Sequence, residues 1–276
     1  MTEITVNRLI FNFTFREEKV LFLGPMLRGG LGFFLKRNLP GEKYRMLFET
    51  PTDARIMKLY PHAPKGFALK VPWQTGKRCR VEVRVFRDDE DVFSAIRDAF
   101  MYLAGQKRFL CRFEGHRPER IALLAKNESA YEGKFKVRFL TPTAVKYRGR
   151  FWREPEFHVL VRNLLRRIFL LGHFHFGMDF KIDFKDLIAQ AEGVKIVRKE
   201  VLPVQLEWFS TRQRRRFPLW GFMGEVEYEG QISPELHSFL SSGELINAGR
   251  FTTYGMGSLK FCFLDKRKKL SKEVSL

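Results

Sequence analysis

One order of predicted elements occurs twice along this chain, and it restricts the fold more than any other feature of the sequence. In the first half, alternating apolar and polar residues predict strands over residues 5–15 and 78–86. A helix is expected to begin at Gly24-Pro25 and end near Pro40, and an amphipathic helix to cover 90–104. Residues 61–72 are expected to form a loop and then a short strand, and two more short strands are expected at 109–113 and 120–125. The order therefore begins strand, helix, strand, strand, helix, strand. This order is typical of a ferredoxin-like fold.

The second half repeats the order, although no sequence identity between the halves supports the repeat. Its predicted strands cover 134–140, 202–209, 222–228 and 258–264, and its helices cover 157–169 and 234–245. A polar segment near 127–133 separates the halves. We therefore predict an α+β protein of two tandem ferredoxin-like (RRM-like) domains, at residues 1–130 and 131–276.

A glycine-rich stretch follows the last predicted helix. Ser233 and Pro234 are suited to begin that helix, as N-cap and first helical residue. Glycines allow a backbone to approach a ligand closely, and free N–H groups, hydroxyls and arginine suit phosphate oxygens. A tight helix-to-strand turn without a ligand is the alternative. The residues predicted to contact a phosphate-bearing ligand here are Gly249, Arg250, Thr252, Thr253, Tyr254, Gly255 and Gly257.

The charge of the chain points to a polyanionic partner. Lys and Arg number 50 against 31 acidic residues, a net charge of +19, and nucleic acid is the commonest partner of such a protein. The sequence contains no apolar run long enough to span a membrane, and its start does not read as a secretory signal. Three widely spaced cysteines form neither a disulfide framework nor a metal cluster. We expect a cytoplasmic protein with no metal and no cofactor.

Two further groups of cations are candidate phosphate contacts. A basic run between two predicted strands would repel itself unless an anion lies between its members, although most such runs are solvated loops. It consists of Arg212, Arg214, Arg215 and Arg216. On the helix at 157–169, Arg162 and Arg166 are one turn apart and either line a groove or coat the outer face. Arg167 lies on the same helix.

Histidines are the usual acid and base catalysts, and this chain has six. His173 and His175 are separated by one residue, so two imidazoles could share the acid and base roles. The alternative is a helix end with partly buried rings. The sequence shows no order typical of a serine hydrolase and no phosphate-binding lysine loop.

Several segments in a fixed order resemble the RAMP superfamily of CRISPR-associated proteins, and within it the endoribonuclease that cuts CRISPR precursor RNA. The segments are LRGGLGFFLKR (27–37), YRMLFETP (44–51), LTPTAVKYRG (140–149), FSTRQ (209–213), GFMGEVEYEG (221–230) and NAGRFTTYGMG (247–257). The resemblance implies binding of a CRISPR repeat RNA and cleavage of one phosphodiester without metal. The 2′-hydroxyl would attack the adjacent phosphorus, leaving a cyclic phosphate.

The chain departs from the family pattern at two positions. Phe33 and Asn247 stand where family members often carry histidines. Catalysis would then pass to other residues, and our candidates are Arg28, Lys36, Tyr44 and His173. A lysine can transfer protons near neutral pH only if its pKa is lowered, as crowded cations would do.

The missing histidines keep a second function open, a repeat-RNA-binding subunit of a CRISPR effector complex with weak or no activity. A third hypothesis is a general basic nucleic-acid-binding protein. The expected partners are CRISPR repeat RNA or its mature guide form and, for the second function, effector-complex subunits. Whether two copies form a homodimer is left open.

Overall fold

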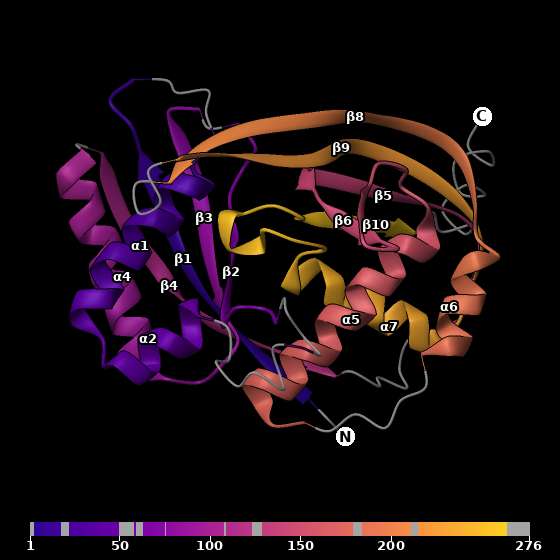
Figure 1. Cartoon of the computed structure of the whole chain (residues 1–276), viewed down its shortest axis with the longest axis horizontal. Coiled ribbons are helices and arrows are strands. Elements are labelled where there is room, and N and C mark those ends of the chain that lie inside the picture. Colours follow the sequence, from indigo (N-terminus) through magenta and orange to yellow (C-terminus); the bar gives the residue numbers. More distant parts are fainter. Residues whose placement is uncertain are drawn as a thin grey trace, which may run out of the picture.

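The computed structural model describes residues 3–17, 22–49, 58, 63–74, 76–107, 109–122, 129–178, 184–210 and 215–263. Within these ranges the chain has an α+β fold with two four-stranded antiparallel sheets, one in each half of the chain (Figure 1). Both sheets have the ferredoxin-like order, in which the first and third strands of each half lie at the centre. The prediction of two tandem ferredoxin-like folds is confirmed.

The first half places its helices on one face of its sheet. The sheet order is β2-β3-β1-β4, and β1 is antiparallel to both of its neighbours. Apolar side chains from β1 and β3 pack against the buried faces of α1 and α4, with Phe11 and Phe13 against Phe100. The elements are β1 (Glu3–Thr14), α1 (Gly24–Asn38), α2 (Gly41–Phe48), β2 (Phe67–Lys70), β3 (Arg78–Val85), α4 (Glu90–Lys107) and β4 (Leu110–Ala122).

The second half repeats this plan with a longer helix and longer strands. Its sheet order is β10-β5-β9-β8. Its elements are β5 (Tyr131–Thr143), β6 (Val145–Tyr147), β7 (Arg150–Trp152), α5 (Phe157–Phe176), α6 (Lys185–Glu192), β8 (Lys195–Ser210), β9 (Arg215–Ile232), α7 (Pro234–Ile246), the short 3-10 helix η1 (Thr252–Tyr254) and β10 (Leu259–Phe263). As predicted, the Ser233 hydroxyl caps α7 by accepting a hydrogen bond from the N–H of Leu236.

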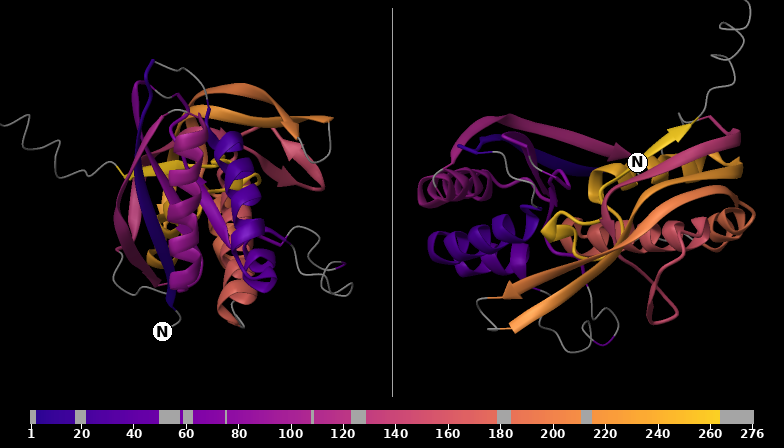
Figure 2. Two further views of the ribbon diagram at one scale, coloured as in Figure 1. Left: turned by 90° about the vertical axis from the view of Figure 1, so that its left-hand side faces the viewer. Right: turned by 90° about the horizontal axis from the view of Figure 1, so that it is seen from above.

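The halves are packed together rather than joined only by a linker. Ile4, Val6, Ala68 and Phe86 belong to the first half, yet they are buried in the core of the second half. The strands β8 and β9 arch from the second half across the molecule toward the side of the first half that carries α1, as Figures 1 and 2 show. The loop carrying η1 lies between the halves, which places it where a site shared by both could form.

Several predicted elements differ from those in the structure. The two short strands predicted at 109–113 and 120–125 are parts of the single strand β4. The predicted helix 157–169 continues to Phe176, so the histidines lie inside its last turns. The short helices α2 and α6 were not predicted as helices; each has eight residues, too few for a clear period. The boundary at residue 130 falls between β4 and β5 and stays a prediction.

Candidate RNA-binding and catalytic pocket

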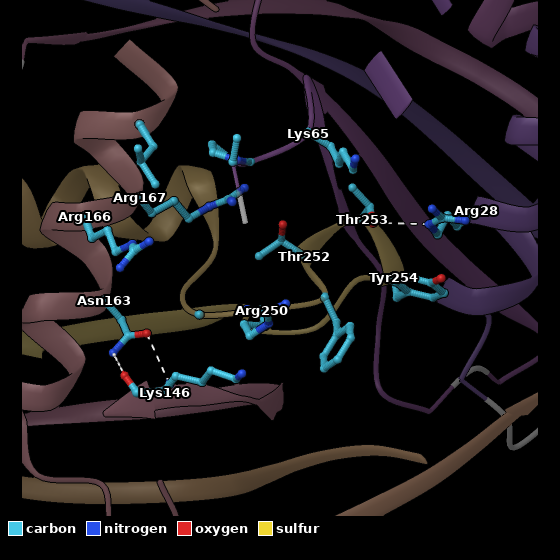
Figure 3. A pocket seen from close by; sticks show the side chains of 15 residues that line it. Arg28, Lys65, Lys146, Asn163, Arg166, Arg167, Arg250, Thr252, Thr253 and Tyr254 are labelled. Atoms are coloured by element: carbon cyan, nitrogen blue, oxygen red, sulfur yellow. Dashed lines mark hydrogen bonds between the residues drawn. The ribbon is translucent and has the colours of Figure 1, made fainter. Parts of the chain in front are cut away.

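A pocket of about 400 Å³ lies between the two halves, around the loop that carries η1 (Figure 3). Its walls come from segments far apart in the sequence: α1 and the segment before β2, the strand β6, the middle of α5, and the loop after α7. Its lining residues are Arg28, Ala63, Pro64, Lys65, Lys146, Asn163, Arg166, Arg167, Leu170, Gly249, Arg250, Phe251, Thr252, Thr253 and Tyr254.

The lining is strongly cationic. It contains four arginines and two lysines, and no aspartate or glutamate is among the described lining residues. Like charges gathered around a cavity repel one another, and an anion bound among them would relieve that repulsion. The pocket is therefore suited to the phosphates of a nucleic-acid backbone.

One end of the pocket contains the cations of the first half of the chain, and we call it the N-terminal end. It is formed by Arg28, Lys65, Thr253 and Tyr254. Arg28 reaches across from α1, and its Nε donates a hydrogen bond of 3.3 Å to the Thr253 hydroxyl. Its guanidinium carbon lies 4.5 Å from the centre of the Tyr254 ring, a cation–π distance. These contacts join residues 225 positions apart in the sequence and hold the Arg28 guanidinium at the pocket.

Lys65 stands beside this group on the segment before β2. Burial and the neighbouring Arg28 lower the pKa of Lys65 to about 8, while Glu49 acts in the opposite direction. At neutral pH the side chain is mostly protonated but releases its proton far more readily than an exposed lysine. This is the property that a proton-transfer residue needs.

The other end, the C-terminal end, is formed by Lys146, Asn163, Arg166, Arg167 and Arg250. Asn163 fixes the backbone of Lys146 by two hydrogen bonds: its Nδ2 donates to the Lys146 carbonyl at 3.0 Å, and its Oδ1 accepts from the Lys146 N–H at 3.3 Å. Burial, and secondarily Arg166, lower the pKa of Arg250. This end collects positive charge on fixed elements.

Arg167 is the deepest cation of the C-terminal end. Its Nε donates to the Ile246 carbonyl at 2.9 Å, whereas its buried Nη2 has no hydrogen-bond partner among the described residues. Burial lowers the pKa of Arg167 to about 9. A buried donor without a partner is costly, so this atom is a ready site for an anionic oxygen.

The glycine-rich loop contributes to the pocket differently from our prediction. Many of its N–H groups are not free: those of Arg250, Tyr254, Gly255 and Gly257 donate to backbone carbonyls of the protein. The glycines are required by tight packing. At Gly249, with φ +72°, a Cβ would lie 2.3 Å from the Ala144 carbonyl oxygen. Phosphate contacts from this loop must therefore come mainly from its side chains.

Asn247, at the position before the loop where relatives often carry a histidine, is fully buried and does not line the pocket. Its Nδ2 donates to the carbonyls of Leu69 and Met256 at 2.9 and 3.1 Å, and its Oδ1 accepts from Arg84 at 3.2 Å. Arg84 also donates to two carbonyls at the end of α7. In this chain, Asn247 fastens the loop to the first half.

The structure brings some of the predicted site residues together and leaves others apart. Besides Arg28, the pocket contains five of the seven predicted loop residues: Gly249, Arg250, Thr252, Thr253 and Tyr254. Gly255 and Gly257 lie in the same loop but outside the lining, and Gly257 packs on the Ala248 carbonyl. Of the three arginines noted on α5, Arg166 and Arg167 line the pocket, while Arg162 pairs with Glu192.

Three predicted catalytic residues are not among the lining residues. Lys36 is exposed on α1, about 12 Å along the helix axis from Arg28. The Tyr44 ring stacks on Phe48. His173 is exposed, with its ring against Phe169 and Phe174. Their catalytic roles stay predictions.

Only part of the basic run at 212–216 belongs to the described residues. Arg212 and Arg214 fall outside the described residues, and only the backbone of Arg215 is described, at the start of β9. Arg216 is part of β9 rather than of a loop, and it is exposed and paired with Glu207 at 3.0 Å.

The sequence did not single out the pocket residues Lys65, Lys146 and Asn163, and it predicted no partner for His175. His175 is a described histidine near the site: its ring forms a hydrogen bond with the carbonyl of Pro64, which lines the pocket, at 3.0 Å. Burial chiefly lowers the pKa of His175, with Arg167 contributing. No hydrophobic period or sequence motif indicates that these residues belong to a site, although Lys146 lies in one of the segments that carry the family resemblance.

Other features of the described part of the chain bear on the site. No group of three or more His, Cys, Asp or Glu side chains there is placed to hold a metal ion. Among the helices described, none is long and apolar enough to cross a membrane.

Fold and pocket together define a class of protein: two ferredoxin-like folds packed around a cationic pocket that suits a polyanion. Residues 137–259 match the family model of the CRISPR-associated endoribonuclease Cas6. This part of the chain is similar to that family of endoribonucleases. No curated protein matches the chain.

Solved Cas6 structures share the fold over most of the chain. Thermus thermophilus Cas6 is 17% identical, with a TM-score of 0.59, over 94% of this chain and 98% of that one. A Cas6 product complex is 18% identical, with a TM-score of 0.58, over 94% and 100% of the two chains. A partial Cas6-RT-Cas1–Cas2 complex is 14% identical, with a TM-score of 0.58, over 95% of this chain and 47% of that one.

Proposed function

We propose that this protein is a metal-independent endoribonuclease that cuts CRISPR precursor RNA within its repeats. The observation that carries the proposal is the pocket lined by six cations and, among the described residues, by no carboxylate. The match of residues 137–259 to the family model supports the substrate class, and the pocket supports the chemistry: it offers positive charge to a phosphodiester, and its described lining contains no carboxylate to bind a divalent cation.

In the proposed reaction, the 2′-hydroxyl of the nucleotide before the cut attacks the adjacent phosphorus. The products are a 2′,3′-cyclic phosphate and a 5′-hydroxyl. Negative charge grows on the phosphorus oxygens in the transition state, and Arg28 is placed to stabilise it because Thr253 and Tyr254 hold its guanidinium. The C-terminal end of the pocket would hold a neighbouring phosphate and so contribute to affinity for the RNA.

The test is cleavage of RNA carrying the CRISPR repeat of the protein's own locus, in the presence of EDTA. We expect one cut per repeat and a 5′ fragment whose end resists phosphatase until the cyclic phosphate is opened. A reaction that requires magnesium, or a 3′-hydroxyl product, would contradict the mechanism.

The second candidate function is a repeat-RNA-binding subunit without activity. The specific observation in its favour is that both usual histidine positions are unsuited to catalysis. Asn247 is buried in a structural role, and Phe33 is exposed beneath the guanidinium of Arg37. This function predicts tight repeat binding with intact RNA recovered, whereas a general nucleic-acid-binding protein would bind duplex DNA equally well. Association with effector-complex subunits belongs to this second proposal.

A further inference from the structure

We propose that Lys65 is the general acid of the reaction, the residue that protonates the leaving 5′-oxygen. This inference deepens the proposed endoribonuclease function and rests on it. It replaces the absent histidines with a residue that no motif indicates, on a segment where the sequence predicted only a loop.

The backbone on both sides of Lys65 is fixed. The Pro64 carbonyl accepts a hydrogen bond from His175 on α5 at 3.0 Å. On the other side, the Gly66 N–H donates to the Leu47 carbonyl at 3.2 Å, and the Gly66 carbonyl accepts from the Phe86 N–H at 3.0 Å. A Cβ on Gly66 would lie 2.9 Å from the Met46 carbonyl oxygen, so the chain is held against the end of α2. The Lys65 side chain therefore starts from a rigid point.

From that point the side chain extends toward Thr253, on the same side of the pocket as Arg28 (Figure 3). Arg28 and Lys65 thus face the same part of the pocket from two elements of the first half. A phosphate oxygen held by Arg28 and Thr253 would place the bridging oxygen of the same phosphodiester within reach of the Lys65 ammonium.

The surroundings of Lys65 suit it to proton transfer, and those of its neighbours do not. A guanidinium keeps its proton near neutral pH, so Arg28 can stabilise charge but cannot act as the acid. The Thr253 hydroxyl accepts the hydrogen bond from Arg28 and can still donate to a phosphate oxygen, but an aliphatic hydroxyl is too weak an acid to protonate the leaving oxygen near neutral pH. Burial and the Arg28 charge bring the pKa of Lys65 to about 8, near working pH, where a general acid is most effective.

The proton and electron balance is simple. The 2′-oxygen forms a bond to phosphorus and its proton goes to water, while the bond between phosphorus and the 5′-oxygen breaks. The electron pair of that bond stays on the 5′-oxygen, which takes a proton from the Lys65 ammonium. The resulting neutral amine regains a proton from solvent, so no metal or other co-reactant enters the step.

The test compares wild type with Lys65→Met, Lys65→Arg and, as a matched control, Lys260→Met, which removes an exposed lysine on β10 far along the sheet. Single-turnover cleavage is measured on repeat RNA and on the same RNA with sulfur in place of the bridging 5′-oxygen. A thiolate leaves without protonation, so the sulfur substrate does not need a general acid.

On normal RNA we expect both Lys65 variants to be slower than wild type by about 100-fold or more, the usual contribution of a general acid. Lys65→Arg should keep wild-type affinity, because it retains the charge, and still be slow. On the sulfur substrate all four proteins should react at similar rates. The wild-type rate on normal RNA should rise with pH and level off near pH 8. In Lys65→Arg the rate should keep rising up to the highest pH measured.

The charged groups that act on the pKa of Lys65 are Arg28 on α1, which lowers it, and Glu49 after α2, which raises it. Across Pro64, the charge of Lys65 contributes to lowering the pKa of His175 on α5, as do Arg167 and Arg87. A Lys65 defect that is equally large on the sulfur substrate would show a role in charge or positioning and overturn the proposal. Wild-type rates for Lys65→Met on normal RNA would do the same. If wild type cuts neither substrate, the proposed endoribonuclease function itself fails, and the Lys65 proposal fails with it.

Discussion

The two ends of the pocket carry similar charge but differ in the kind of cation and in how each is held. The N-terminal end has one arginine held by Thr253 and Tyr254, beside a lysine with a lowered pKa. The C-terminal end has three arginines and a lysine, and one guanidinium nitrogen there is buried without a partner among the described residues. The difference indicates that the first end is suited to moving a proton and the second to holding a phosphate.

The comparison is tested most strongly by Arg28→Met. Removing one preorganised cation from the position where charge develops should lower the single-turnover rate by about 100-fold or more. Affinity for uncut RNA should change by less than about threefold, because a single phosphate contact contributes modestly to affinity. Arg97→Met on α4 removes a similar exposed charge and is the matched control.

If Arg28→Met instead lost affinity and rate in equal measure, the N-terminal end would be part of the binding surface. The division between the two ends would then be wrong.

Asn247→Ala tests whether both ends of the pocket are positioned by the hydrogen bonds that tie the loop to the first half. The variant loses two donated hydrogen bonds and the bond from Arg84, in a position with φ +60° that alanine tolerates poorly. The free energy of unfolding should fall by about 2–3 kcal/mol, measured by urea denaturation. Asn247→Gly separates the causes, because it relieves the strain at positive φ but not the loss of hydrogen bonds.

Because Asn247 ties the loop to Leu69 of the first half, rate and affinity should fall together in these variants. A variant of normal stability that lost only one of the two would show that the ends are positioned independently.

The double variant Arg166→Ala, Arg250→Ala tests the C-terminal end. Two lost phosphate contacts should reduce the slope of log affinity against log salt by about 1.4 for single-stranded RNA, and affinity at moderate salt on the order of tenfold. The rate at saturating protein should be nearly unchanged. The control is Arg97→Ala, Lys260→Ala, which removes the same charge from exposed positions outside the pocket.

The sequence was sufficient to predict what depends on local pattern. Alternation and amphipathic period gave the order of strands and helices in both halves, and Ser233 and Pro234 marked the start of α7. The predicted residues Arg28, Arg250, Thr252, Thr253 and Tyr254 all line one pocket, and the family resemblance covers both of their segments. Their roles stay predictions.

What could not be predicted depends on contacts between distant segments. Lys65 has a lowered pKa only because Arg28 and burial surround it, and both arise from the tertiary packing of α1 against the segment before β2. Asn247 reads as an ordinary helix-end residue, and only its burial against Leu69 and Arg84 shows its structural role. The N–H groups of the glycine loop seemed free because the carbonyls that take them, such as that of Ala144, lie about 100 positions away.

The smallest effect is expected outside the pocket, at Arg216. Its exposed guanidinium is paired with Glu207 at 3.0 Å, so part of its charge is already balanced. Arg216→Ala should weaken RNA binding by less than about threefold and change the salt slope by less than one, as expected for at most one screened contact. Glu207→Gln should have the opposite sign and strengthen binding slightly, because it leaves the Arg216 charge unbalanced. Arg216→Ala could instead weaken RNA binding as much as the double variant at Arg166 and Arg250 does. The start of β9 would then bind RNA as strongly as the C-terminal end, and the RNA-binding surface would extend from the pocket along the β8–β9 hairpin.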